Sequence, residues 1–239
     1  MLRSAVFRIC RRSALVGLLS LTLSAATQTS RSEFLAKLSS AAIERTHHPV
    51  RYVSSYVRIP YPGGDVPADT GVCTDEVIRS HRALGIDLQK EVHEDMLRDF
   101  DAYPHGRQRQ PDTNIDHRRV PNLMVFFARR GTELPTATDP RTYSPGEIVA
   151  WDLGGGITHI GIVVNHRGPS GSYMVVHNIG RGPQMEDVLF NWKIIGHYRY
   201  YGASNLITRS ASRESPSLAP AYRPHRPACQ GADVRFSET

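Results

Sequence analysis

Cys73 is the first residue in the chain whose position suggests chemistry, because it stands at the predicted start of an amphipathic helix. Asp69 and Thr70 are good N-cap residues, and Asp75 and Glu76 place negative charge in the first turn. Unpaired backbone N–H groups at a helix start favour the thiolate, the form that attacks carbonyls. The two acidic residues oppose this effect, so the local sequence leaves the pKa of the thiol open. A free cysteine is also commonly a small buried hydrophobe, so other residues must decide its role.

A nucleophilic cysteine needs an imidazole that takes and returns a proton, and a third group that orients the imidazole. The chain has 11 histidines, so position must select among them. His159 begins a predicted strand after a glycine loop, and His177 ends the next strand. If the hairpin between them centres near Pro169 or Ser170, the two histidines share one sheet face, one step apart. A slip of one residue would separate them and make Asn178 the better orienting group.

The elements that must position these residues change character along the chain. Apolar periodicity predicts helices over residues 31–46, from Cys73 to Gly85, over 86–100 and over 122–130. Consecutive strands are predicted over residues 148–151, 157–165, 173–179 and 192–200. Helices that precede consecutive strands indicate an α+β fold, with the N-terminal helices packed on a C-terminal antiparallel sheet.

The two ends of the chain differ from its centre in composition. Residues 1–26 combine a basic region, a short apolar run and the small residues Ser24-Ala25-Ala26, which predicts a cleaved signal peptide. Residues 202–239 are rich in Ser, Pro and Arg and are expected to be disordered. Both segments are basic, and the remaining chain is formally neutral although the whole carries +6. We therefore expect a periplasmic or secreted protein with no stable membrane anchor after signal cleavage, and no nucleic-acid partner.

The cysteines follow from this division of the chain. Cys10 precedes the apolar run of the signal, so the mature chain carries Cys73 and Cys229. These two could pair in an oxidising compartment. Because Cys229 lies in the Ser/Pro/Arg-rich tail, which offers no fixed geometry for a disulfide, we expect Cys73 to be unpaired.

Several motifs in a fixed order resemble a known group of enzymes. Cys73 at a helix start, Pro145–Val149 before a strand, His159–Val163 and Val175–His177 together resemble the signature of NlpC-type papain-like cysteine peptidases. Residues 61–75, 114–122 and 151–156 resemble more closely the YijF-like proteins, an uncharacterised bacterial family. This likeness covers roughly residues 35 to 201, and the catalytic domain is expected over residues 31–201.

The resemblance implies a papain-like NlpC-type fold and a Cys-His-His triad that cleaves an amide of peptidoglycan stem peptides. Cys73 would attack the carbonyl, its backbone N–H would hold the oxyanion, His159 would act as base and then acid, and His177 would orient His159. The resemblance implies no cofactor, and it leaves open both the bond that is cleaved and transfer in place of hydrolysis. Candidate cleft residues are Tyr61, Asp65, Asp69 and Trp151.

Two other interpretations compete with a hydrolase. A non-catalytic cell-envelope binding or scaffold module could retain the same fold, because a fold does not guarantee activity. A second polar cluster has the ligand types of a zinc site but no spacing that puts two ligands on one helix face, so we expect no metal there. The residues of this cluster are His93, Glu94, Asp95, Asp116 and His117. A buried polar bracket or a cleft lining is the expected role of Asp116, His117, Arg118 and Arg119.

Overall fold

The computed structural model describes residues 30–203, and within this part the predicted helices are confirmed to within a turn. A first helix spans residues 30–45, and three further helices are Cys73–Arg82 (α2), Leu88–Arg98 (α3) and Val120–Arg130 (α4). Short 3-10 helices are Phe100–Ala102 (η1), Asp116–Arg118 (η2) and Pro140–Thr142 (η3). Apart from residues 202 and 203, the predicted signal and tail lie outside the described residues. In residues 30–203 no helix is long and apolar enough to cross a membrane.

The strands form a six-stranded sheet in the order β3-β8-β4-β5-β6-β7, in which all neighbours are antiparallel. Its members are Thr132–Glu133 (β3), Ile148–Asp152 (β4), Thr158–Arg167 (β5), Tyr173–His177 (β6), Gln184–Glu186 (β7) and Lys193–Arg199 (β8). The two short strands Arg51–Tyr52 (β1) and Thr70–Gly71 (β2) pair in parallel beside α2. The fold is therefore α+β with an antiparallel sheet, as predicted; the short strands β3 and β7 were not predicted.

The register between β5 and β6 is the predicted one. Ile162 lies opposite Val176, and the same register carried toward the strand end places His177 opposite Gly161. His159 therefore shares a sheet face with His177, one step along the strands. A Cβ at Gly161 would lie 2.7 Å from Cγ1 of Val175, 2.8 Å from the carbonyl oxygen of Val176 and 3.1 Å from the Cβ of His177, so glycine allows β6 to approach β5 closely beside His177.

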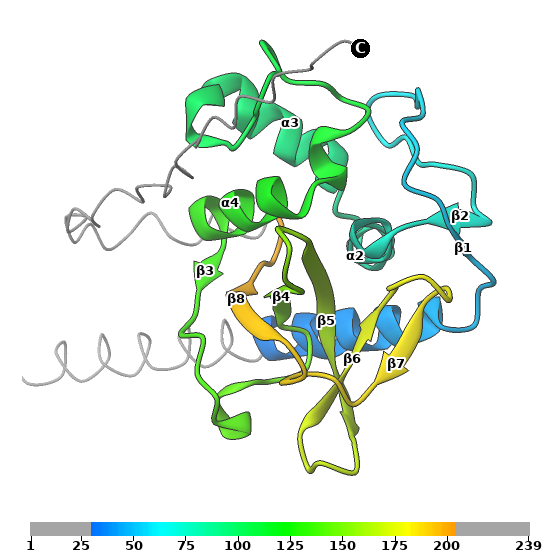
Figure 1. Ribbon diagram of the computed structural model, residues 1–239, viewed down its shortest axis with the longest axis vertical. Helices are drawn as coiled ribbons and strands as arrows, with labels where there is room; N and C mark the ends of the chain where they lie inside the picture. Colours follow the sequence, from blue (N-terminus) through cyan, green and yellow to red (C-terminus); the bar gives the residue numbers. More distant parts are fainter. Residues whose placement is uncertain (1–29, 204–239) are drawn as a thin grey trace, which may run out of the picture. The chain divides into compact units, whose positions relative to one another are not determined.

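The two faces of the sheet bury different side chains, because residues alternate along each strand. The face toward the helices packs with them in one apolar cluster, which includes Leu38, Cys73, Val77, Leu123, Phe126, Ile148, Ile160, Ile162 and Val176. The opposite face forms a second cluster of Tyr143, Val149, Trp151, Val163, Val175, Val188 and Leu189. Figure 1 shows α2, α3 and α4 grouped on one side of the sheet, with the helix of residues 30–45 running along it.

The start of α2 differs from the prediction in its cap. The N-cap residue is Val72, and neither Asp69 nor Thr70 caps the helix. The carboxylate of Asp75 accepts a hydrogen bond of 2.7 Å from the N–H of Val72, so the cap comes from inside the first turn. Asp69 instead pairs with Arg51 on the surface, at 2.8 Å.

Candidate active site

The first turn of α2 is fixed by a buried ion pair with η2. Arg118 donates from Nε and Nη2 to the two carboxylate oxygens of Asp75, at 2.8 and 3.0 Å. Both side chains are only 2% exposed, and Thr74 Oγ1 adds a hydrogen bond to the carbonyl of Arg118. Two parallel bonds set the orientation of both groups as well as their separation. The backbone at Cys73 is therefore fixed by the bonds that Thr74 and Asp75, the next two residues, make to Arg118.

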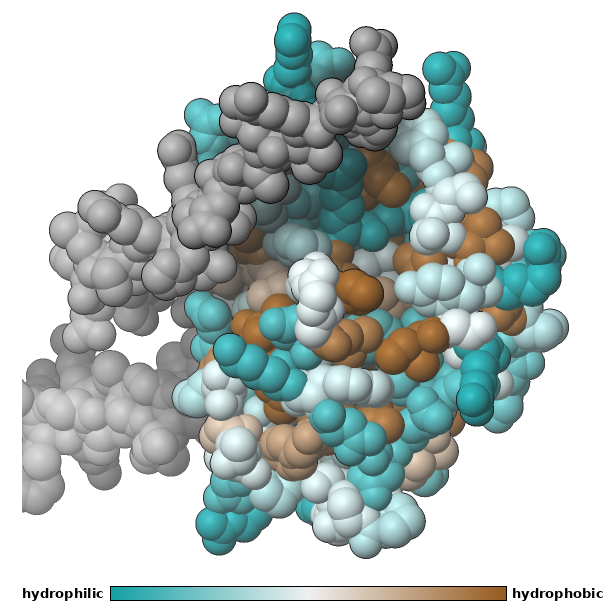
Figure 2. Space-filling view, viewed as in Figure 1, coloured by the Kyte–Doolittle hydropathy of each residue, from teal (hydrophilic) through white to brown (hydrophobic). Residues whose placement is uncertain are grey.

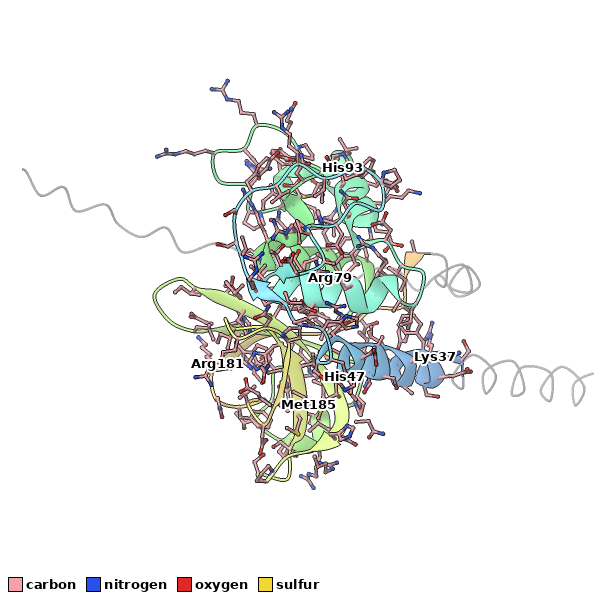
Figure 3. The ribbon with its side chains drawn as sticks, turned by 90° about the vertical axis from the view of Figure 1, so that its right-hand side faces the viewer. Lys37, His47, Arg79, His93, Arg181 and Met185 are labelled. Atoms are coloured by element: carbon pink, nitrogen blue, oxygen red, sulfur yellow. The ribbon has the colours of Figure 1, made fainter. Side chains whose placement is uncertain are left out.

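A second set of charges fixes the remainder of α2. Arg79, at the centre of the view in Figure 3, donates to Asp65 at 2.9 Å and to the carbonyl of Thr70 at 2.9 Å. Glu76 accepts from Arg45 of the first helix at 2.8 Å. Asp65, a predicted cleft residue, thus ties the loop before the helix to α2. These contacts join α2 to its flanking segments without using Cys73.

The Cys73 thiol is free and buried. Burial raises its pKa to about 12, and the backbone amide of Ile160 and the charge of Asp75 act on it in opposite directions, the amide lowering and the carboxylate raising the pKa. The amides of Cys73 and Thr74 at the helix start also lower the pKa. Burial exceeds their effect, so the resting thiol is protonated at neutral pH.

The sheet register explains why the amide of Ile160 faces the sulfur. In an antiparallel pair of strands, hydrogen-bonded and non-hydrogen-bonded residue pairs alternate. Val163 N donates to Glu147 O, so Glu147 and Val163 form a hydrogen-bonded pair. Counting along the register from there, Ala150 and Ile160 form a pair that is not hydrogen-bonded. The N–H of Ile160 is therefore turned away from β4, toward the side of β6. Because β6 ends at His177, no strand residue meets this amide. The thiol of Cys73 lies beside the free amide of Ile160, the residue that follows His159 in β5.

Asn178 turns away from the histidines. Its side-chain amide donates to the carbonyl of Gly71 at 3.5 Å, and its oxygen accepts from the N–H of Gly180 at 3.1 Å. These bonds hold the segment just before Cys73. Asn178 is therefore placed to position the loop of the cysteine, and His177 is the residue that contacts His159.

His159, His177 and Glu186 form a hydrogen-bonded relay. Nε2 of His159 lies 2.8 Å from Nδ1 of His177, and Nε2 of His177 lies 2.8 Å from Oε2 of Glu186. An ionised carboxylate can only accept, so His177 donates from Nε2 and accepts at Nδ1. His159 must then donate from Nε2, which leaves its Nδ1 with a free lone pair. The relay thus fixes the tautomer in which His159 can act as a base.

Two tryptophans enclose the imidazoles. Trp151 lies opposite His159 across β4 and β5 and stacks on its ring at 5.7 Å, and Trp192 meets both histidine rings edge-on at 6.2 and 6.1 Å. Burial, and after it the neighbouring His177, lower the pKa of His159 to about 3. The pKa of His177 is also lowered by burial, against the opposing charge of Glu186. Both imidazoles are therefore neutral at rest.

A cavity of about 410 Å³ opens at the thiol. Its lining combines the β1 segment, the start of α2, the η2–α4 junction and β5: Tyr52, Ser54, Val72, Cys73, Pro104, Arg118, Arg119, Val120, Pro121, Asn122 and Thr158. Figure 2 shows hydrophobic side chains over the region where β5 and β6 lie in Figure 1. Ile157 and Ile179, which flank these strand ends, are 62% and 42% exposed. The thiol therefore borders a space of ligand size next to apolar surface.

Three predicted cleft residues lie elsewhere. Tyr61 is 40% exposed and packs edge-on against His93 at 5.1 Å, because its turn lies over α3. Asp69 is held by its ion pair with Arg51 on the surface. Trp151 is fully buried in the second cluster and supports His159 from beneath. None of the three lines the cavity at Cys73.

The structure joins the two histidines but not the thiol to the imidazole. In residues 30–203, Cys73 and His159 share no hydrogen bond, and Nδ1 of His159 bonds no other group. The ring of His159 stacks on Trp151, whereas Ile160 packs in the cluster that contains Cys73. The imidazole and the sulfur thus approach β5 from different sides of the strand. Their contact requires the thiol to turn past the end of β6.

Glu186 is a site residue that the sequence prediction missed. It lies on β7, where Gln184 is opposite His177 and Glu186 is one step further on the same face. Only three residues long, β7 follows a Gly-Pro break, so no periodicity marks it. Its place beside His177 depends on the pairing of β6 with β7, so no local signal in the sequence identifies it.

The second polar cluster forms internal brackets. Asp95 accepts from Tyr103 at 2.6 Å and from Arg129 at 2.9 Å, and Asp116 accepts from Gln108 at 2.8 Å. Among residues 30–203 no group of three or more His, Cys, Asp or Glu side chains is placed to hold a metal ion. These carboxylates therefore join α3, α4 and the loop before η2.

Comparison with known proteins is consistent with the uncharacterised family suggested by the motifs. Residues 39–200 match the family described as "Domain of unknown function (DUF1287)". The chain is 52% identical over 151 residues to the "Uncharacterized protein YijF" of Escherichia coli (strain K12). The aligned region covers 63% of this chain and 74% of the relative. The matched residues include Cys73, the two relay histidines and Glu186 within their range. The chain therefore belongs to the DUF1287 family.

Proposed function

We propose that the protein is an exported cysteine hydrolase, an amidase or endopeptidase with a papain-like NlpC-type arrangement, that cleaves an amide bond of peptidoglycan stem peptides. One observation carries the proposal: a relay from half-exposed Glu186 through buried His177 leaves the lone pair of His159 Nδ1 free, next to the strand backbone that faces the Cys73 thiol. A nucleophile, a base and an orienting group are the parts that acyl transfer requires.

The proposed reaction starts from the neutral pair. Once the thiol has turned past the end of β6, Nδ1 of His159 takes its proton as Sγ of Cys73 bonds to the substrate carbonyl carbon, and the negative charge moves to the carbonyl oxygen. The amides of Cys73 and Thr74 at the positive end of α2 stabilise this oxyanion. His159 then returns the proton to the leaving amine as the C–N bond breaks. Water, deprotonated by the same nitrogen, releases the acyl group and restores the thiol.

His177 and Glu186 act through His159 in this scheme. As His159 becomes cationic, its Nε2–H remains donated to His177, whose own proton is held by the carboxylate of Glu186. Trp151 and Trp192 pack on the two buried imidazoles and keep water from them, which strengthens the hydrogen bond between His159 and His177. His177 and Glu186 are therefore positioning residues, and Cys73 and His159 are the catalytic pair.

Incubation of the purified exported form with peptidoglycan sacculi, followed by mass spectrometry of the released muropeptides, tests the proposal. New stem-peptide fragments are expected with the natural protein and with Cys229→Ser, which changes the cysteine of the Ser/Pro/Arg-rich tail. Cys73→Ser and His159→Gln should release none. If the natural protein and Cys73→Ser yield the same products, the hydrolase is refuted for this substrate. Sedimentation of both proteins with sacculi, without any cleavage, would instead support the non-catalytic envelope-binding module.

A further inference from the structure

The cavity at Cys73 carries positive charge and no negative charge of its own. Of its lining side chains, Arg118 and Arg119 are basic and none is acidic. The other polar members, which include Tyr52, Ser54 and Asn122, are neutral at pH 7. The cavity therefore favours a ligand with a negatively charged or hydrogen-bond-accepting group that can bind a guanidinium.

The charge of Arg118 is already used inside the protein. Both carboxylate oxygens of Asp75 accept from its Nε and Nη2, and its Nη1 donates to the carbonyl of Ser55 at 3.3 Å. A buried bidentate pair of this kind leaves no guanidinium edge for a ligand. Arg118 is therefore a structural residue, although it lines the cavity.

Arg119 differs from its neighbour because its protein partner is neutral. Its Nη1 donates to the amide oxygen of Gln108 at 2.8 Å, while the amide nitrogen of Gln108 donates to Asp116 at 2.8 Å. Gln108 thus links the guanidinium to Asp116, and the charges of Asp112 and Asp116 act on Arg119 without forming an ion pair with it. Among residues 30–203 no carboxylate forms an ion pair with Arg119, and its other N–H groups bond no protein atom.

We propose that Arg119 binds a carboxylate of the substrate peptide, and so selects acidic peptides whose scissile amide lies at Cys73. The half-buried side chain is oriented by Gln108 before any ligand arrives, and its free edge presents the paired N–H donors that match a carboxylate. Because Arg119 and Cys73 line the same cavity, one peptide contacts both. This assignment rests on the proposed function and names the chemistry of its substrate.

The test uses stem peptides that contain the D-glutamyl–diaminopimelyl bond, with each free carboxylate replaced in turn by a carboxamide. For the natural protein we expect one amidation to lower kcat/KM by about 10- to 100-fold, mainly through KM, which is the effect of one lost hydrogen bond to a charged group. In Arg119→Gln this discrimination between the acid and the amide peptide should vanish. Arg119→Lys, which keeps the charge but not the fork, should restore part of it.

Arg109→Gln is the matched control, because Arg109 is an exposed arginine of the loop before η2, next to Gln108, that does not line the cavity. It should discriminate as the natural protein does. If Arg119→Gln retains the full preference for the carboxylate, the assignment of Arg119 is wrong and the hydrolase proposal stands. If no peptide is cleaved, calorimetry of the same peptides on Cys73→Ala, with and without Arg119→Gln, decides the assignment alone. Equal binding of acid and amide forms there, or no binding, overturns it.

Discussion

Removal of the Asp75 charge should destabilise the protein far more than removal of a similar surface charge. In Asp75→Asn, the guanidinium of Arg118 stays buried at 2% exposure but loses its counter-ion. Breaking a buried pair from one side costs about 3–5 kcal/mol, because the remaining charge is left without compensation. For a domain of this size, that loss lowers the thermal midpoint by roughly 10 °C.

Asp69→Asn provides the matched control for this measurement. It makes the same chemical change in an ion pair of the same 2.8 Å length, but the side chains of Arg51 and Asp69 are 71% and 62% exposed. Exposed pairs contribute about 0–1 kcal/mol, because water and side-chain entropy offset the attraction. The two variants therefore separate the effect of burial from the effect of charge.

Urea unfolding at pH 7, followed by the fluorescence of Trp151 and Trp192, gives both free energies. The double variant Asp75→Asn with Arg118→Met should cost less than the sum of its single changes, since it leaves no unpaired charge. If Asp75→Asn and Asp69→Asn differ by less than about 1 kcal/mol, the buried pair does not fix the first turn of α2.

Three further outcomes follow from the site and the core. Glu186→Ala should lower kcat/KM by about 10- to 100-fold and Glu186→Gln by less, because glutamine can still accept from His177; equal activity of both variants and the natural protein would exclude the relay. Alkylation of Cys73 by iodoacetamide, read by mass spectrometry, should speed up about tenfold per pH unit from pH 7 to 10, since the thiol pKa is about 12; a plateau from pH 5 would contradict a protonated thiol. Fully buried His81 has its pKa lowered by burial from 6.5 to about 4, so below pH 6.5 only the unfolded chain gains its proton and stability falls by about 3 kcal/mol by pH 4. Thermal midpoints of His81→Leu at pH 7.5 and 4.5 should therefore differ less than those of the natural protein.

The helices and the central strands were predictable because their signals are local. Apolar periodicity marked α2, α3 and α4, and short apolar runs bounded by turn residues marked β4, β5 and β6. The short hairpin connection between β5 and β6 set the register, so the shared face of His159 and His177 followed from the sequence. Edge strands of two or three residues, such as β3 and β7, carry no period that can be recognised.

The contacts that complete the site depend on residues distant in the chain. Asp75 and Arg118 are 43 positions apart, and their pairing requires η2 to pack beneath α2. Asp69 has a side chain suited to an N-cap, but the helix begins later in the chain, and the carboxylate of Asp75 accepts the hydrogen bond from the N–H of the N-cap residue Val72. Burial of the thiol likewise depends on the meeting of α2 with β5, so its pKa could not be read from the first turn alone.

The resting charges of the site bear on how it would act. With the thiol pKa near 12 and the His159 pKa near 3, both groups are neutral across the physiological range, and no thiolate–imidazolium pair is stored. Under the proposed function, the proton leaves sulfur only as the new bond to carbon forms. The amides at the start of α2 then stabilise the negative charge on the carbonyl oxygen, and His177 with Glu186 stabilises the positive charge on His159. Both supports are already oriented, so the arrangement favours the charges of the transition state over those of a resting thiolate.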